Sequence, residues 1–124
     1  MNTFARRVFL VAGIYGLIVL LPLYFMRPAA LARPEDYFGF IGTAVAWQLC
    51  FLVISRDPPR LRPIMLPAIV EKLVFSFPVL ILVSQHRMAP TAAVFAAIDL
   101  LLGALFYISW RHTTGELPPL KSAI

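Results

Sequence analysis

Cysteine is almost absent from this chain of 124 residues, and motifs for catalysis or metal binding are missing. The single cysteine, Cys50, excludes an internal disulfide and the paired-cysteine chemistry of a membrane thiol oxidoreductase. There is no glycine-rich phosphate loop, no cluster of side chains with metal-ligand spacing, and no Ser, His and Asp arrangement typical of nucleophilic catalysis. We therefore expect no cofactor, and no motif supports an enzyme.

Charged residues are also scarce, at 14%, whereas hydrophobic residues make up 60% of the chain. The mean hydropathy of +0.84 lies far from the balance of a soluble domain. Continuous apolar runs favour helices over a barrel, whose strands would alternate apolar and polar residues. The sequence predicts an all-α, integral membrane four-helix bundle with up-down topology, formed by 1–124 as a single domain. The predicted transmembrane spans, each near the ~20 residues needed to cross a bilayer, are 8–25, 38–54, 64–83 and 91–110.

The first span has an alternative interpretation as a secretory signal peptide. Arg6 and Arg7 precede the apolar run, and the Ala-Leu-Ala at 30–32 resembles a cleavage site. The run is longer than the usual signal core of about 7–15 residues, and Arg27 separates it from the cut. We favour a retained span.

Arg and Lys are divided unequally between the two sides of the predicted bundle. Seven lie on the side of the termini and the second loop: Arg6, Arg7, Arg56, Arg60, Arg62, Arg111 and Lys121. Three lie on the other side: Arg27, Arg33 and Arg87. The positive-inside rule therefore predicts that both termini are cytoplasmic. The formal net charge of +5 then indicates contact with anionic headgroups and not with nucleic acid.

Prolines predict the form of two connections. Pro34 followed by Glu35 and Asp36 is typical of a helix start, because proline fits the first turn and acids favour the positive end of the helix dipole. The segment 55–63 is too rich in proline to be helical throughout, so we expect a rigid turn there.

Three ionisable residues fall inside the predicted spans. Glu71 and Lys72 lie near the middle of the third span, and Asp99 near the middle of the fourth. A charge at this depth is unfavourable without a partner or water, so each is a candidate functional residue. Trp47 and Gln48 lie at a similar depth in the second span and complete a candidate ligand-binding set.

Helical spacing predicts how the polar residues pair. Adjacent positions on a helix diverge by about 100°, so Glu71 and Lys72 should be poor partners for each other. We expect Lys72 to reach Asp99, and Glu71 to turn toward Gln48. Two interpretations stay open: a buried salt bridge that holds the bundle in register, or a ligand or ion site built on the same residues. For Trp47 the alternatives are simple packing and the lining of an interior pocket.

Three segments carry a resemblance to known proteins: Arg60–Val74, the Ala-Trp-Gln at 46–48 and the Ile-Asp-Leu-Leu-Leu-Gly at 98–103. With them the chain resembles small uncharacterised bacterial inner-membrane proteins with four spans. Its architecture is more loosely similar to DoxX-like proteins and to the four-span sterol-isomerase superfamily. The resemblance implies a bacterial inner membrane, and it carries no isomerase activity over, because only intramembrane acids beside a tryptophan match that pattern.

Two other four-span classes fit less well. Small multidrug exporters have their essential acid in the first span, which here has none. Haem-binding cytochromes need histidines inside the spans, whereas His86 and His112 lie in or next to loops.

These observations lead to one functional hypothesis and one alternative. The first is a protein whose mid-membrane polar site binds a small lipophilic or cationic molecule. The alternative is an accessory or structural subunit of a larger membrane complex without a ligand site. A binding protein should contain a cavity lined by the candidate residues, and an accessory subunit should bury them without one. The lipid bilayer is a partner in both, and either could form a homo-oligomer or join a larger membrane partner.

Overall fold

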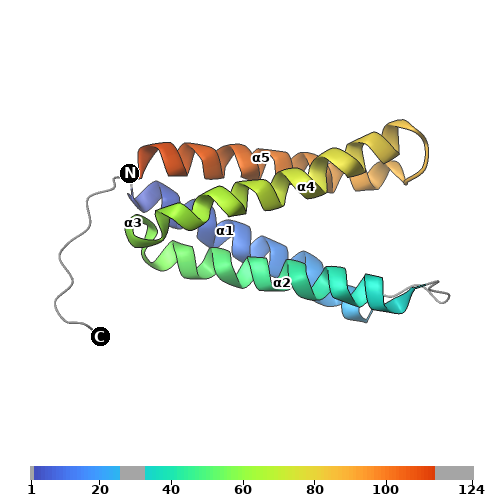
Figure 1. Cartoon of the computed structure of the whole chain (residues 1–124), viewed down its shortest axis with the longest axis horizontal. Coiled ribbons are helices and arrows are strands. Elements are labelled where there is room, and N and C mark those ends of the chain that lie inside the picture. The colour runs from blue at the N-terminus through green and yellow to red at the C-terminus, as the bar shows by residue number, and fades with distance from the viewer. Residues whose placement is uncertain (1, 26–32, 114–124) are drawn as a thin grey trace.

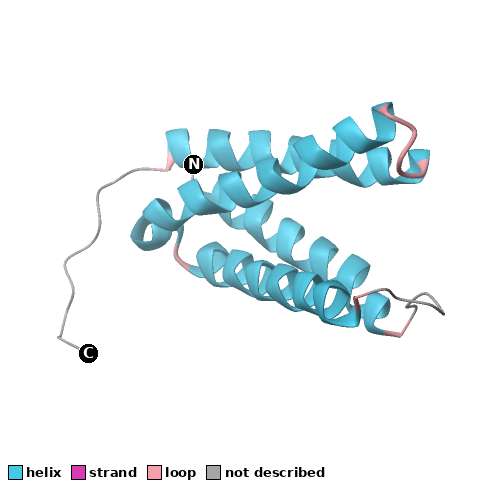
Figure 2. Cartoon of the chain, turned by 45° about the vertical axis from the view of Figure 1, so that its right-hand side comes forward, coloured by secondary structure: helices cyan, strands magenta, loops and turns pink. Residues whose placement is uncertain are grey.

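The computed structural model describes residues 2–25 and 33–113 of the chain, and its long elements are four helices that run up and down beside one another (Figure 1). The long helices are α1 (Asn2–Leu20), α2 (Pro34–Arg56), α4 (Met65–Ser84) and α5 (Pro90–His112). Three short pieces extend or join them: the 3-10 turn η1 (Leu21–Tyr24), the helix α3 (Pro58–Leu61) and the 3-10 turn η2 (Arg62–Ile64). Helices and short loops make up all of the described part (Figure 2).

All four long helices are long and apolar enough to cross a membrane. Their outer faces carry large apolar side chains that would be unfavourable in water, such as Ile18 (68% exposed) and Val74 (63% exposed). The prediction of an all-α bundle with four membrane spans is therefore confirmed, and the chain is a multi-pass integral membrane protein. The Ala-Leu-Ala at 30–32, Arg27 and Lys121, on which the signal-peptide and orientation arguments partly depend, lie outside the described residues.

The helix start predicted at Pro34 is confirmed. Pro34 is the first residue of α2, and Glu35 and Asp36 occupy its first turn. The proline-rich connection is more helical than we expected, because Pro58 and Pro59 stand at the first positions of α3, where a missing N–H does no harm. The break from α2 is made at Asp57, whose backbone angles (φ −150°, ψ 73°) are not helical.

The turn between α4 and α5 closes with a left-handed residue. His86 has a φ of 59°, and its N–H donates to the carbonyl of Val83 at 3.0 Å. The N–H of Arg87 donates to the carbonyl of Leu82 at 2.9 Å. These two bonds form a Schellman motif, which satisfies the last carbonyls of α4 and reverses the chain into α5.

The four helices form two antiparallel pairs, α1 with α2 and α4 with α5. Helix α1 also packs on α5, whereas α2 and α4 touch little. The pairs lie close together at the end that carries α3 and diverge toward the opposite end (Figure 2). We call these the closed end and the open end.

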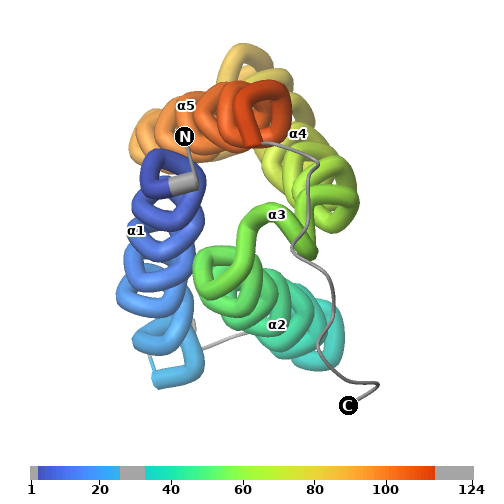
Figure 3. Tube along the Cα trace, turned by 90° about the vertical axis from the view of Figure 1, so that its left-hand side faces the viewer, coloured from blue at the N-terminus to red at the C-terminus, as the bar shows by residue number. Residues whose placement is uncertain are grey.

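Aromatic stacking holds the closed end together. The rings of Phe9 and Phe106 stack at 4.2 Å, and Phe51 meets Phe106 edge-on at 4.9 Å. All three side chains are fully buried, so α1, α2 and α5 share one dry core. The Nε of Arg62 donates to the carbonyl of Trp110 at 2.8 Å, which ties η2 to the end of α5. Seen from this end, α3 lies between α2 and α4 (Figure 3).

Candidate functional site

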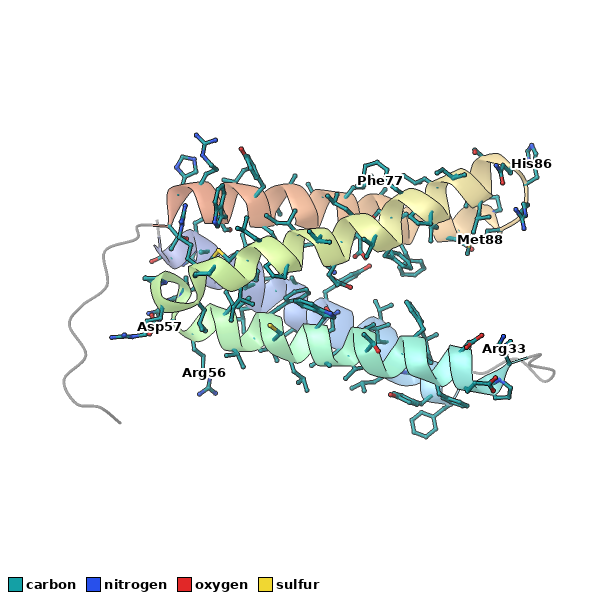
Figure 4. The ribbon with its side chains drawn as sticks, in the orientation of Figure 1. Arg33, Arg56, Asp57, Phe77, His86 and Met88 are labelled. Atoms are coloured by element: carbon teal, nitrogen blue, oxygen red, sulfur yellow. The ribbon has the colours of Figure 1, made fainter. Side chains whose placement is uncertain are left out.

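A cavity of about 630 Å³ lies between the two helix pairs, on the open side of the aromatic core. All four long helices line it, mostly with apolar side chains. Its volume is in the range of pockets that hold small molecules. Met88 lines the cavity at the end far from α3 (Figure 4). At its inner end lies a group that we call the polar cluster: Gln48, Glu71, Lys72 and Asp99.

Lys72 is the centre of the polar cluster, with a side chain only 4% exposed. Its Nζ donates to Oδ1 of Asp99 at 3.3 Å, which confirms the predicted pair. The same Nζ lies 3.7 Å from Oε1 of Glu71 and 5.1 Å from the centre of the Phe51 ring. One ammonium group is therefore shared by two carboxylates and an aromatic face.

The prediction that Glu71 and Lys72 are poor partners was wrong. Helix geometry fixes the directions of their Cβ atoms, which do diverge, but not the position of a terminal amine on four methylene groups. The lysine stem lets Nζ swing back toward its neighbour while it also reaches Asp99 on α5. Lys72 therefore makes salt bridges with both acids.

Two small contacts hold Lys72 in place. A Cβ on Gly103 would lie 3.3 Å from the Cβ of Lys72, so the glycine lets α5 approach α4 at this level. Ser76, fully buried one turn further along α4, donates from its Oγ to the carbonyl of Lys72 at 2.8 Å. The stem of the lysine is thus packed against α5, whereas the serine bond is made to the backbone of Lys72.

Gln48 lies on α2 with only 2% of its surface exposed. Its Nε2 donates to the carbonyl of Ala44 at 2.8 Å, which fixes the orientation of the amide because the oxygen cannot donate in its place. The side chain packs directly on Gly16, where a Cβ would collide with it. Gln48 is therefore held from both sides within the cavity lining.

Two buried oxygens of the polar cluster have no hydrogen-bond donor within the described part of the chain: Oε1 of Gln48 and Oε1 of Glu71. We expected Glu71 to turn toward Gln48, but these two oxygens do not bond to each other, since both are acceptors unless the carboxyl is protonated. Oε1 of Glu71 still has the ammonium group of Lys72 at 3.7 Å, whereas Oε1 of Gln48 is buried against Gly16. Buried polar atoms are nearly always paired, so the Gln48 oxygen is the unusual one.

Trp47 lies outside the cavity. It lines a groove of about 1180 Å³ between α2 and α4, and its ring contacts the core at 6.2 Å from Phe51. We call this the α2–α4 groove. The groove and the cavity share a boundary made by Phe40, Ala44, Glu71, Phe75 and Val79. The structure thus brings four of the five candidate residues to one cavity and places the fifth beside it.

Tyr15 on α1 was missed by the sequence interpretation. It lines the cavity and is half-buried. The available signal was its position in the middle of the first span, because tyrosines in membrane helices usually lie at the headgroup level. A tyrosine at mid-depth needs a polar surrounding, and here the cavity supplies one.

The chemistry of the site follows from its groups. The cavity lining holds two carboxylates and one ammonium group, so it carries one excess negative charge when all three are ionised. Among the described residues, no group of three or more His, Cys, Asp and Glu side chains could hold a metal ion. The site is suited to accept hydrogen bonds from a guest molecule with an apolar body.

Comparisons with known proteins found no relative of this chain. No family model, curated protein or solved structure matches the chain. The resemblance noted from the sequence therefore extends only to architecture, that of a helical membrane protein with four spans.

Proposed function

We propose that this protein binds a small lipophilic molecule that carries a hydrogen-bond donor. The apolar body of the molecule fills the cavity between the helix pairs, and the donor meets the Glu71 carboxylate. The observation that carries the proposal is the cavity itself, whose mostly apolar lining includes two carboxylates and only one ammonium group.

The energetics of buried polar groups support this proposal. Leaving a buried acceptor without a donor costs about 1–3 kcal/mol, and more for a charged group. A guest that donates to the Glu71 carboxylate would add the hydrogen bond that Lys72, at 3.7 Å, does not make. Predominantly apolar pockets with a few convergent polar groups are typical of small-molecule sites.

The alternative, an accessory subunit without a ligand site, has less support. It predicts that the polar residues are buried without a cavity and that small residues form an exposed groove. Instead, Ala96 and Gly103 on α5 are buried inside the bundle. Four polar residues line a cavity large enough for a guest.

We further propose an orientation and a location. Arginines gather at the closed end of the described structure: Arg6, Arg7, Arg56, Arg60, Arg62 and Arg111. Only Arg33 and Arg87 lie at its open end. By the positive-inside rule the closed end faces the cytoplasm and the cavity opens toward the other leaflet. For the location we propose a bacterial inner membrane, because the architecture resembles that of small bacterial proteins with four spans. One shared core supports a single domain.

Equilibrium binding of two fluorescent probes tests the function. Dansylcadaverine carries an ammonium group, and the dansyl amide of aminopentanol carries a hydroxyl group on the same chain. Each is titrated onto the full chain in phosphatidylcholine nanodiscs. We expect saturable binding of at least one probe to the parent.

Variants locate the bound probe. Ala92→Trp fills the cavity, whereas Ala97→Trp places the same side chain on an exposed position of the same helix that lines neither the cavity nor the groove. Glu71→Gln keeps the shape of the side chain and removes its negative charge. We expect Ala92→Trp and Glu71→Gln to lose binding with helicity unchanged, and Ala97→Trp to retain it. Absence of saturable binding to the parent, or unchanged binding by Ala92→Trp, would contradict the proposal and favour the accessory subunit.

A further inference from the structure

We infer that the α2–α4 groove is a lateral entrance through which a lipophilic organic cation passes from the bilayer into the cavity. This inference rests on the binding function proposed above and specifies both the charge of the ligand and its route.

The packing of the bundle leaves one side open. Contacts between α1 and α2, between α4 and α5, and between α1 and α5 close the other three sides. Helices α2 and α4 touch little, and the groove lies between them. The α4 side of this groove carries exposed apolar residues, including Val70 (54% exposed) and Val74 (63% exposed), which in a membrane face lipid tails. A lipophilic molecule can therefore reach the groove without leaving the bilayer.

Glu71 connects the groove to the cavity, because it lines both. Its side chain is 16% exposed and lines the groove, while its Oε1 is buried 3.7 Å from the Nζ of Lys72. A molecule that passes between α2 and α4 meets this carboxylate before it meets Gln48 or Asp99, which line the cavity alone.

The charges along the route favour a cation. The groove is lined by three acids, Glu35, Asp36 and Glu71, and among the described residues no Arg or Lys lines it. Arg33 pairs with Glu35 at 3.3 Å and with Asp36 at 3.0 Å, so among the described residues one excess negative charge stays at the outer end of the groove. The cavity adds Asp99 and Lys72, which balance each other. This acidic route lies in a chain whose formal net charge is +5.

The hydrogen bonding of Glu71 indicates the same chemistry. The Nζ of Lys72 lies 3.7 Å from Oε1 of Glu71, which is beyond hydrogen-bond distance, so the carboxylate has capacity for a further donor. An organic ammonium group has up to three N–H donors and no acceptor, so it can donate to the Glu71 carboxylate. It also neutralises the excess negative charge, which an uncharged hydroxyl group cannot do. Charge-assisted hydrogen bonds are about twice as strong as neutral ones.

The two probes introduced above test the charge preference. We expect the parent to bind dansylcadaverine at least about tenfold more tightly than the hydroxyl probe, since one charge-assisted bond replaces a neutral one. Equal affinities would overturn the preference for a cation and leave the binding function intact. Failure of both probes to bind would instead contradict the binding function itself.

Stopped-flow kinetics test the entrance. Gly39 lines the groove but not the cavity. Apart from its chain neighbours and its own helix backbone, no atom of the described residues lies within 4 Å of where its Cβ would be, so Gly39→Trp should obstruct the groove without strain. Ala46→Trp is the matched control, because Ala46 is exposed on the same helix and lines neither space. Thr43→Trp, also exposed and lining the groove alone, is a second obstructing variant.

We expect both obstructing variants to slow association and dissociation of dansylcadaverine by about tenfold each. The reason is that they raise the free-energy barrier in the groove and leave the free and bound states unchanged. The equilibrium affinity should stay that of the parent, and Ala46→Trp should exchange at the parent rate. If both obstructing variants exchange the probe as fast as Ala46→Trp, the entrance lies elsewhere and the inference is wrong.

Discussion

Removal of Lys72 should destabilise the bundle more than removal of Asp99, although the two residues form one salt bridge. The asymmetry follows from the second carboxylate. Lys72 contacts both Asp99 at 3.3 Å and Glu71 at 3.7 Å, so each acid depends on the lysine while the lysine depends on neither alone.

The magnitudes follow from what each variant leaves behind. Lys72→Met leaves two carboxylates, whose side chains are only 16% and 15% exposed, without a cation, and breaking a buried pair in this way costs about 3–5 kcal/mol. Asp99→Asn leaves the ammonium group beside Glu71 and supplies an amide oxygen that can still accept a bond. We expect it to cost about 1–2 kcal/mol, close to the loss of one hydrogen bond to a charged group.

Unfolding in detergent micelles, followed by circular dichroism, measures both variants and their combination. The double variant has no carboxylate at position 99 that could be left without a cation. Its loss of stability should therefore be smaller than the sum of the losses in the two single variants, by about 1–3 kcal/mol. Equal losses of stability in the two single variants would refute the idea that Lys72 serves two carboxylates. Strictly additive losses would refute the pairing of Lys72 with Asp99 altogether. A triple variant that adds Glu71→Gln should recover further stability.

Three more predictions follow from the packing and the charge distribution. Gly16→Ala should cost about 1–3 kcal/mol in the same unfolding assay, because its methyl group displaces the Gln48 amide that packs on it. Gly42→Ala should be neutral, because the nearest contact of its methyl group would be an ordinary 3.6 Å. Equal effects of the two variants would contradict the close packing at Gly16. Phe106→Ala should cost on the order of 3 kcal/mol of stability, because it opens a cavity in the aromatic core. Phe77→Ala, at an exposed position, should change the stability little. A small loss for Phe106→Ala would show that the aromatic core is not the stabilising element. Reporter fusions after Ser55 and at the carboxyl end should both give cytoplasmic signals, and a signal from the opposite side at either point would contradict the proposed orientation.

The sequence predicted the elements of this fold well because bilayer thickness and proline chemistry act locally. The apolar runs gave all four long helices, and the helix start at Pro34 was predicted from that residue and its two following acids. The pair between Lys72 and Asp99 could also be predicted, since two buried charges of opposite sign at one depth have few other partners.

The relation between the helix pairs could not be predicted in this way. The cavity exists because the pairs diverge from the aromatic core, and this divergence depends on contacts far apart in sequence, such as that of Phe9 with Phe106. The position of Trp47 in the groove depends on the same angle. The contact of Glu71 with Lys72 was missed for another reason, because it is decided by a flexible side chain and not by helix geometry.

The divergence of the two helix pairs also gives the molecule unequal cross-sections. Near α3 the pairs lie close together, and toward the opposite end they separate (Figure 2). In a bilayer such a body occupies more area in one leaflet than in the other, so its insertion spreads the lipids of the two leaflets unequally. Anything that changes the angle between the pairs changes this difference in area. The lateral pressure of the surrounding lipid is therefore coupled to the angle between the pairs, and through it to the space that separates them.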